Sequence, residues 1–467
     1  MSGVNLRHRG REFWAEYRQD RAGLVGVGLL LLFLFLLAFE PFIVPFPEGS
    51  ARWHDITYWA DNPPSAAPAW TNWFRAKKSA VADVIREAET STEESNGVRL
   101  VRRSFAYEYA YDVPPLDVVA RFTATGDVPT VLTVSRPDGI ELELFSEQFT
   151  AGDKEPVRIS VDRASQQAVY AFLKQYESEE TSGLVDITQL DPTTLIFAEA
   201  GAGMDADPQP LHGRYVFTLT TMLLGEDRAA DDPHLVISGR VSGLLGTDNS
   251  KRDLWTGLVA GVKWALLIGL LTAFVSVSVG VIAGIASAYF RGWIEVVIQR
   301  IFEIIVNLPL LPVLIILAAV FKLNIWYFMG IMCIYFWTGP VKTVYSMALQ
   351  IKEETYIEAS RAIGAKSGRI IFRHMVPLLV PYSFASMALY VPSAVVYEAT
   401  VSLLGLGDAK IVTWGQILHD ALTGGAILSG LWWWVVPPGL LIALVGMTFA
   451  FVGFAMDKIL HPKLRTR

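Results

Sequence analysis

Long apolar runs without a single charge constrain the fold of this chain more than any other feature. A helix rises about 1.5 Å per residue, so roughly 20 apolar residues cross the hydrocarbon core of a bilayer. Six runs approach that length: Ala22 to Phe39, Trp264 to Phe290, Ile304 to Phe321, Leu323 to Val341, Met375 to Tyr397 and Ala426 to Met456. The sequence therefore predicts an α-helical membrane protein with six transmembrane helices, of which the third is kinked by Pro309 and Pro312.

The distribution of charge predicts the orientation of these helices. Residues 46–248 hold about 32 acidic and 17 basic side chains, whereas the rest of the chain is net basic. Lys and Arg mark the cytoplasmic loops of multi-pass proteins, and here they gather in the N-terminus, the 291–300 loop, the 342–373 loop and the C-terminus. We expect a multi-pass protein of a prokaryotic cytoplasmic (inner) membrane, with both termini in the cytoplasm and the acidic block outside. The first run is long and lacks an A-x-A exit, so we expect a retained anchor.

The acidic block alternates apolar and polar residues as strands do. Thr130 to Ser135 and Ile140 to Ser146 flank the turn sequence Arg136-Pro137-Asp138-Gly139. Further strands are expected at Val157 to Val161, Tyr215 to Thr221 and Leu235 to Val241, and a helix at Gln166 to Gln175. Cys333 is the only cysteine, so the block must fold without an intrachain disulfide.

The expected organisation follows from the runs and the charge. It comprises a cytoplasmic N-terminus (1–21), transmembrane helix 1 (22–45), an inserted extracytoplasmic mainly-β (α+β) domain (46–248), a core with transmembrane helices 2–6 (249–460) and a cytoplasmic tail (461–467). The core includes a cytoplasmic loop at 352–377.

This basic loop between the fourth and fifth runs has its own pattern. Thr355-x-x-Glu358 fits a capping box at the start of a short helix, and Gly364 fits the left-handed residue that ends one. A second helix is expected from about Lys366 to Met375, before Pro377 begins the next span. Small side chains that suit insertion into a partner's groove lie in the first helix: Ala359, Ser360 and Ala362. The alternative is a loop that only enforces topology or touches anionic lipid.

The loop resembles the EAA loop of ABC importer permeases, whose pattern is E-A-A-x3-G-x9-I-x-L-P. Glu358, Ala359, Gly364 and Pro377 fall in register, and Ser360 replaces an alanine. His374-x-Val376-Pro377 is similar to the H-x-L-P variant of the dipeptide/oligopeptide/nickel subfamily.

Other segments resemble the same subfamily. Leu245-Gly246-Thr247-Asp248 with Arg252-Asp253 is similar to L-G-T-D-x-x-G-R-D, with Lys251 in place of glycine. Residues 398–407 with Trp414-Gly415 resemble E-A-S-L-S-F-L-G-L-G…W-G, and residues 432–439 resemble W-W-x-x-x-P-G. Only Asp457, Leu460 and Pro462 echo the usual ending. The resemblance covers the first span and residues 245–467, about half the chain, and the acidic block has no counterpart in the usual member.

The resemblance implies the type I ABC importer permease fold and a transmembrane permease subunit that imports peptides, with nickel or oligosaccharides as alternatives. It implies four kinds of partner: a second permease subunit, two ATP-binding cassette ATPase subunits, an extracytoplasmic solute-binding protein and the lipid membrane. The charge distribution gives no support to nucleic-acid binding, and the sequence has no H-E-x-x-H and no paired cysteines, so we expect no metal and no cofactor. The resemblance assigns ATP hydrolysis to the partner subunits. The residues expected to couple ATPase closure to transport are Thr355, Glu358, Ala359, Ala362, Gly364, Arg369 and Pro377.

Charged residues beside the apolar runs are candidates for a pathway or gate. Glu398 ends the fifth run, where ionisable groups often face a pathway; the alternative is an interfacial or structurally paired carboxylate. Asp248, Arg252 and Asp253 precede the second run and are further candidates.

Two patterns resemble chemical sites without meeting their requirements. Gly364-Ala365-Lys366-Ser367 lacks the spacing of a P-loop and follows a helix. His212 and His234 lie near aspartates that we interpret as solvated turn acids and not as metal ligands: Asp205, Asp207, Asp231 and Asp232.

Two other functions compete with transport by an ABC importer. A membrane receptor or sensor could use the outer domain to bind a ligand, but it requires a cytoplasmic signalling domain, which we do not find. An autonomous secondary carrier predicts repeated halves and midplane charges, and neither is evident.

Overall fold

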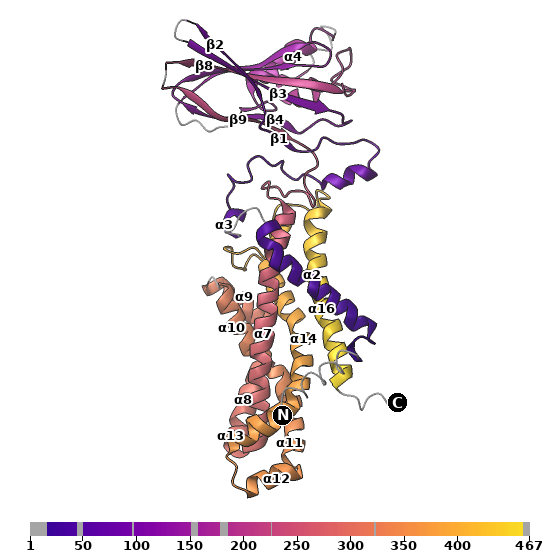
Figure 1. The fold of residues 1–467 in the computed structure, drawn as a ribbon, viewed down its shortest axis with the longest axis vertical. Coiled ribbons are helices and arrows are strands. Elements are labelled where there is room, and N and C mark those ends of the chain that lie inside the picture. The colour runs from indigo at the N-terminus through magenta and orange to yellow at the C-terminus, as the bar shows by residue number, and fades with distance from the viewer. Residues whose placement is uncertain are drawn as a thin grey trace, which may run out of the picture. The chain divides into compact units, whose positions relative to one another are not determined.

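A computed structural model describes residues 16–43, 50–95, 98–150, 157–177, 185–225, 227–321 and 324–460 of the chain. The chain divides into two compact units: a helical unit of Met1–His54 with Thr256–Arg467, and a β-rich unit of Asp55–Trp255 (Figure 1). Parts of the predicted cytoplasmic termini, residues 1–15 and 461–467, and the predicted end of the first span at 44–45 lie outside the described residues.

The helical unit consists of long helices joined by shorter ones. They are α2 (Arg21–Ile43), α3 (Ser50–Trp53), α7 (Leu254–Phe290), α8 (Gly292–Asn307), α9 (Leu310–Phe321), α10 (Ile325–Phe336), α11 (Thr338–Lys352), α12 (Thr355–Ala362), α13 (Ser367–Ile370), the π-helix η3 (Ile371–Met375), α14 (Val376–Leu403), α15 (Trp414–Thr423) and α16 (Trp432–Leu460).

Four helical stretches among the described residues are long and apolar enough to cross a membrane: Arg21–Ile43, Leu254–Phe290, Ser367–Leu403 and Trp432–Ile459. The pair α8 and α9 forms a fifth if it counts as one span, bent by 79°. The bend falls at Leu308 and Pro309, as the kink predicted there requires, because proline cannot donate to the helical ladder. The fourth predicted span is divided between α10 and α11, which meet at Trp337. The chain is thus a multi-pass membrane protein, and the count of six spans stays a prediction.

The first helix runs past the end of its apolar run at Phe39, within the predicted span of residues 22–45. α2 continues to Ile43 with Pro41 inside it, which a membrane helix tolerates when neighbouring groups satisfy the freed backbone. The Glu40 carboxylate accepts a hydrogen bond from Lys263 Nζ on α7 at 2.6 Å. This ion pair joins α2 to α7, a contact that the sequence did not predict.

Glycines let α2 approach α16 closely. A Cβ on Gly23 would lie 2.7 Å from the Cβ of Ala455, and one on Gly26 would lie 2.9 Å from the Cβ of Phe451. Small residues at such crossings are what allow membrane helices to pack backbone to backbone.

The β-rich unit contains two antiparallel sheets. Their strands are β1 (Asp83–Ile85), β2 (Glu89–Ser95), β3 (Val98–Tyr109), β4 (Asp117–Thr125), β5 (Val128–Ser135), β6 (Glu141–Phe149), β7 (Val157–Arg158), β8 (Gly213–Leu224) and β9 (Ala229–Ser238). One sheet has the order β1-β9-β4-β7 and the other β2-β3-β8-β5-β6. Short helices complete the unit: η1 (Ala69–Phe74), α4 (Arg163–Leu173), η2 (Ile187–Gln189) and α6 (Pro192–Ile196).

The alternating pattern of the sequence is the reason for these strands. In β5, Val128, Thr130, Leu132 and Val134 are buried while the residues between them are partly exposed, and buried residues of both sheets join one hydrophobic core. The predicted hairpin of β5 and β6 is confirmed, and Gly139 in its turn has φ +82°. The predicted strand from residue 157 is shorter than expected, and the last strand begins and ends earlier.

Arg136, predicted only as a turn residue, is buried in this core. Its guanidinium donates to the carbonyls of Leu195 (3.1 Å), Ile196 (2.9 Å) and Ala198 (2.7 Å) and to the Asp138 carboxylate (2.8 Å). The turn between β5 and β6 thereby satisfies carbonyls at the C-terminal end of α6, which have no partner within that helix.

Candidate functional site: the loop around α12

The loop from Lys352 to Pro377 begins at a fixed point. Lys352, the last residue of α11, donates from Nζ to the carbonyls of Ala288 (3.2 Å) and Tyr289 (2.9 Å) at the end of α7. A lysine at a helix C-terminus satisfies carbonyls that lack partners. The ends of two long helices are therefore joined directly before α12 begins.

The N-terminus of α12 differs from the prediction. Glu354 is the N-cap, and no side chain caps the helix. The predicted capping box of Thr355 and Glu358 is wrong, because Thr355 is already the first helical residue and not the residue before the helix. Both side chains remain exposed.

A single buried residue anchors α12. Ile357 is fully buried and belongs to a core cluster with Ile370, Ile371 and Met375 of the segment that follows. Glu358, Ala359 and Ala362 are exposed. The predicted coupling face of α12 is thus free of intramolecular contacts that would bury it, and its position is set from the opposite side by Ile357.

Gly364 ends α12 as predicted. It has φ +85°, a conformation that costs glycine little. The amide of Gly364 donates to the carbonyl of Arg361 (2.9 Å), and that of Ala365 to the carbonyl of Ser360 (3.0 Å). These two bonds are the Schellman arrangement that closes a helix C-terminus.

The predicted second helix is not a separate element. α13 continues through the π-helix η3 into α14, so Ser367–Leu403 reads as one span. Arg369 and Pro377 lie on its exposed surface. All seven predicted coupling residues are therefore exposed, on one short loop and the first turns of the following helix.

Two apolar side chains that the sequence left out of the site are exposed beside these residues. Ile363 is 87% and Phe372 is 62% exposed. The sequence contained a signal for both residues. Ile363 directly precedes the helix-ending Gly364, and Phe372 lies in a basic stretch; exposed large apolar side chains at such positions indicate a contact surface.

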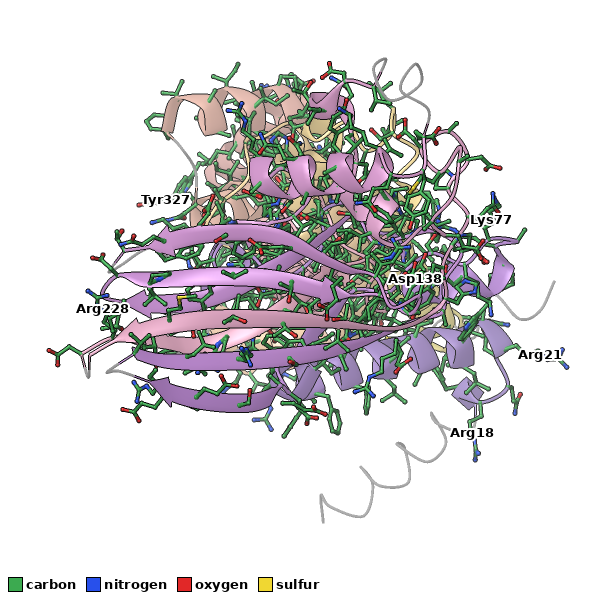
Figure 2. All side chains as sticks on the ribbon, turned by 90° about the horizontal axis from the view of Figure 1, so that it is seen from above. Arg18, Arg21, Lys77, Asp138, Arg228 and Tyr327 are labelled. Carbon is green, nitrogen blue, oxygen red and sulfur yellow. The ribbon has the colours of Figure 1, made fainter. Side chains whose placement is uncertain are left out.

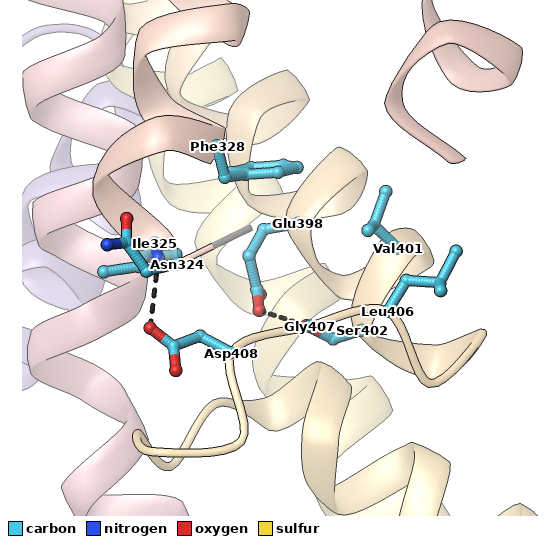
Figure 3. Close-up of a pocket in the computed structure, with 9 residues that line it drawn as sticks. All are labelled: Asn324, Ile325, Phe328, Glu398, Val401, Ser402, Leu406, Gly407 and Asp408. Carbon is cyan, nitrogen blue, oxygen red and sulfur yellow. Dashed lines mark hydrogen bonds between the residues drawn. The ribbon is translucent and has the colours of Figure 1, made fainter. Parts of the chain in front are cut away.

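Glu398 lies in a small pocket whose lining is largely apolar (Ile325, Phe328, Val401 and Leu406) and which also contains Asn324, Ser402 and Asp408 (Figure 3). It is buried, and it accepts a hydrogen bond from Ser402 Oγ at 2.7 Å and one from the Thr413 side chain. Asp408 accepts from the amide of Ile325 at 3.1 Å. The pocket has a volume of about 10 Å³, room for about one water molecule. In this structure Glu398 ties α14 to the segment that leads into α15.

The other predicted pathway residues belong to the β-rich unit. Asp248 is buried, and its carboxylate accepts from the amide (2.8 Å) and Nε (2.5 Å) of Arg252. The backbone of Asp253 pairs with Thr247 across the same turn. Together these contacts close the turn that leads into α7.

Lys251, where the resembling pattern has glycine, is left-handed with φ +67°. Its Nζ donates to the carbonyl of Ala60 at 2.9 Å, and its own carbonyl accepts from Asn62 Nδ2 at 3.0 Å. A left-handed lysine costs free energy that glycine would not, and these contacts offset that cost.

The two histidines of the β-rich unit have separate surroundings. His212 Nε2 lies 3.0 Å from the carbonyl of Tyr111, whereas His234 lies 3.5 Å from the Asp61 carboxylate. Within the described residues no group of three or more His, Cys, Asp or Glu side chains is placed to hold a metal ion. Residues 364–367 join two helices, whereas a P-loop joins a strand to a helix.

Long apolar helices, with a short exposed helix seated between two of them, define a multi-pass membrane protein of the transporter type. Residues 276–466 match the family described as binding-protein-dependent transport system inner membrane component. The dipeptide transport system permease protein DppC of Bacillus subtilis is 34% identical over 47% of this chain and 69% of its own length. The oligopeptide transport system permease protein OppC of the same organism is 31% identical over 55% of this chain and 80% of its own length.

The chain therefore belongs to this family of inner-membrane permease components of ABC importers. Relatives of this kind are transport subunits and not catalysts. Among solved structures, a chain of the inward-facing MetNI methionine ABC transporter aligns with this protein. The alignment covers 46% of this chain and 98% of the MetNI chain, with 19% identity and a TM-score of 0.34.

Proposed function

We propose that this chain is the permease subunit of an ATP-driven importer of peptides. The coupling part of this proposal rests on one observation: α12 has an exposed face, and the buried Ile357 anchors the opposite face of the helix. The names of two similar relatives, a dipeptide and an oligopeptide permease protein, support peptides as the solute.

The mechanism follows from the geometry of the loop. A second permease subunit completes the path, and two ATPase subunits dock on the cytoplasmic side, where Glu358, Ala359 and Ala362 enter a groove of one ATPase. Ile357 packs on residues of the segment that continues into α14. A displacement of α12 on ATP-driven closure is therefore passed to a membrane span without an intervening flexible segment. ATP is hydrolysed in the partner subunits.

The proposed topology has six spans and both termini in the cytoplasm. The bent pair α8 and α9 serves as the third span, and α10 with α11 as the fourth. The β-rich unit, proposed as residues 46–248, then lies outside, where it docks the solute-binding protein or the partner permease. The excess of Lys and Arg in the alternate loops supports this orientation.

The pathway residues remain a proposal of the same kind. Glu398 is proposed as a gate residue, because its bond to Thr413 must break if α14 and the 404–413 segment separate, whereas its bond to Ser402 lies within α14. Asp248, Arg252 and Asp253 are proposed to fix the mouth of the path.

Uptake by the reconstituted system tests the solute. The chain, its partner permease, the ATPases and the binding protein are reconstituted in proteoliposomes, and ATP-dependent uptake of labelled di- and oligopeptides, Ni²⁺ and oligosaccharides is compared. Peptide uptake supports the proposal. Uptake of only Ni²⁺ or only oligosaccharide would show that the importer carries that solute and not peptides. Ligand binding without any uptake would favour the receptor or sensor alternative.

Disulfide cross-linking tests the docking surface. In a Cys333→Ser background, a cysteine at the exposed Ala362 should cross-link to a cysteine in the ATPase groove, and a cysteine at the exposed Ser146 of β6 should not. The absence of any Ala362 cross-link in an actively transporting complex would contradict the docking proposal.

A further inference from the structure

The β-rich unit displays an aromatic–cationic loop, residues 69–78, that the transport function does not use. Trp73 and Phe74, at the end of η1, are 82% and 80% exposed. Three exposed cations follow at once: Arg75, Lys77 and Lys78. Two large apolar rings beside three positive charges is a combination that a soluble surface seldom carries.

Buried hydrogen bonds hold this loop in shape. The Asn72 side chain donates to the carbonyl of Ser79 (2.8 Å) and accepts from its amide (3.1 Å). Thr71 Oγ1 donates to the carbonyl of Pro68 at 2.7 Å. The rings of Trp73 and Phe74 are therefore displayed by a built loop and not left exposed by a loosely packed one.

The loop is fastened to the chain segment that begins α7. Trp70 Nε1 donates to the carbonyl of Leu244 at 2.9 Å. Two residues further on, the carbonyl of Gly246 accepts from the amide of Leu254, the first residue of α7, at 3.1 Å. The 37 residues of α7 extend about 55 Å, more than the roughly 30 Å of hydrocarbon. Part of α7 therefore extends beyond the hydrocarbon on at least one side.

The side-chain charges of the loop form no ion pair within the described residues, although the Asp112 carboxylate accepts from the backbone amide of Lys78 at 2.7 Å. Residues 62–82 contain no Asp or Glu, although the surrounding block is strongly acidic. No ion pair joins Arg75, Lys77 or Lys78 to a carboxylate in the part of the chain that the structure describes. Lys77 lies at the end of the unit opposite to Arg228 of the β8–β9 turn (Figure 2). The three cations of the loop therefore lie away from the β8–β9 turn.

We propose that the aromatic–cationic loop is a membrane anchor that binds the headgroup region of an anionic bilayer. Indole rings prefer the depth of the headgroups, and each Lys or Arg near an anionic surface adds attraction for phosphate. A hollow of about 610 Å³, lined in part by Trp70, Trp73, Arg75 and Lys78, accommodates a phospholipid headgroup between ring and cation. The anchor fixes the β-rich unit at the membrane independently of the solute that is carried.

Spin labelling of the full-length protein in lipid nanodiscs tests this proposal. A nitroxide is placed at Ala76, or at the exposed Val161 as a matched control, in a Cys333→Ser background. Collisions with oxygen and with a water-soluble nickel chelate report the environment of each label. In phosphatidylglycerol-containing discs, Ala76 should be shielded from the chelate and Val161 should not. Replacing all three cations by Glu should lower the equilibrium constant for the shielded state at least roughly tenfold, and the control Arg99→Glu should not change it.

The other outcomes overturn the proposal. An Ala76 label that is as accessible to the chelate as Val161 in anionic discs shows that the loop faces water. A label that becomes shielded only when the solute-binding protein is added shows that the loop docks a protein and not lipid. Uptake of solute is not needed for any of these readings, so failure of the proposed function leaves them intact.

Discussion

The amide of Ala365 donates to the carbonyl of Ser360 at 3.0 Å, so the chain reverses direction at the left-handed Gly364 between them. Gly364→Val should strain this reversal by about 1–2 kcal/mol and tilt the exposed face of α12. Membrane insertion should persist while ATP-dependent uptake falls. Gly368→Val is the matched control: Gly368 is exposed, is not left-handed, and has open space around its Cβ position. Equal uptake in both variants would contradict the role of the Gly364 turn.

The topology is open to labelling by a membrane-impermeant maleimide in intact cells. Cysteines at Ser146 of β6 and at Ala362 of α12 are suited to this, because both positions are exposed, whereas Ser238 is buried. In a Cys333→Ser background, the first should react and the second should react only after the membrane is permeabilised. The reverse pattern would invert the proposed orientation.

Replacement of the buried Arg136 should strongly destabilise the β-rich unit. Arg136→Met removes the side-chain donor from the carbonyls of Ile196 and Ala198, while the carbonyl of Leu195 still accepts from the amide of Ala198; the loss should cost about 3–5 kcal/mol. Arg163→Met, at an exposed position on α4, is the control and should change stability little. Limited proteolysis of the full-length protein reads out the difference, and equal protease resistance would show that the carbonyls find other partners.

The His234–Asp61 contact predicts a pH-dependent contribution to stability. Interaction with Asp61 raises the pKa of His234 above its usual 6.5, and interaction with His234, followed by Arg121, lowers the pKa of Asp61 below its usual 3.8. The histidine contribution is therefore complete below about pH 6.5 and is lost as pH rises through its folded pKa. The aspartate contribution is present above its unfolded pKa and is lost only in acid.

Thermal unfolding of full-length wild-type and His234→Gln proteins checks this dependence. The difference between them should shrink from pH 6 to pH 8.5, by no more than about 1 kcal/mol because Asp61 is partly exposed. Asp61→Asn should abolish the same trend. A wild-type advantage that is constant over this range would assign the contact no electrostatic role.

The base of the β-rich unit allows a clean excision. A Cβ on Gly239 would lie 2.4 Å from the carbonyl carbon of Val81, so a short Gly-Ser linker can replace residues 82–239. Insertion and the Ala362 cross-link to the ATPase should survive, because the α12 loop is untouched, and uptake at limiting solute should fall. Unimpaired uptake would show that the unit is not a docking surface for the binding protein.

Features set by local sequence were predicted well. The alternation of β5 and β6, the turn at Gly139, the break at Pro309 and the left-handed Gly364 each depend on a few neighbouring residues. Features that depend on distant partners were not predicted. β3 pairs with β8, for example at Phe105 and Phe217, and the sequence of neither strand indicates which strand is its partner.

The candidate site shows the same division. The exposed face of α12 followed from its motif, whereas the burial of Ile357 depends on Ile370 and Met375, which approach only when the chain has folded back. The capping box failed because the helix begins one residue earlier than the pattern requires, with Glu354 as the N-cap and Thr355 as the first helical residue.

The left-handed Lys251 depends for its stability on a residue far from it in the sequence. Its Nζ bonds the carbonyl of Ala60, a residue of the segment that the usual subfamily pattern lacks. Lysine at this position should therefore cost stability in a chain that lacks the residues around Ala60. The substitution and the insertion are epistatic: a chain that loses the inserted segment should regain fitness through Lys251→Gly, and a chain that keeps it has little route back to glycine.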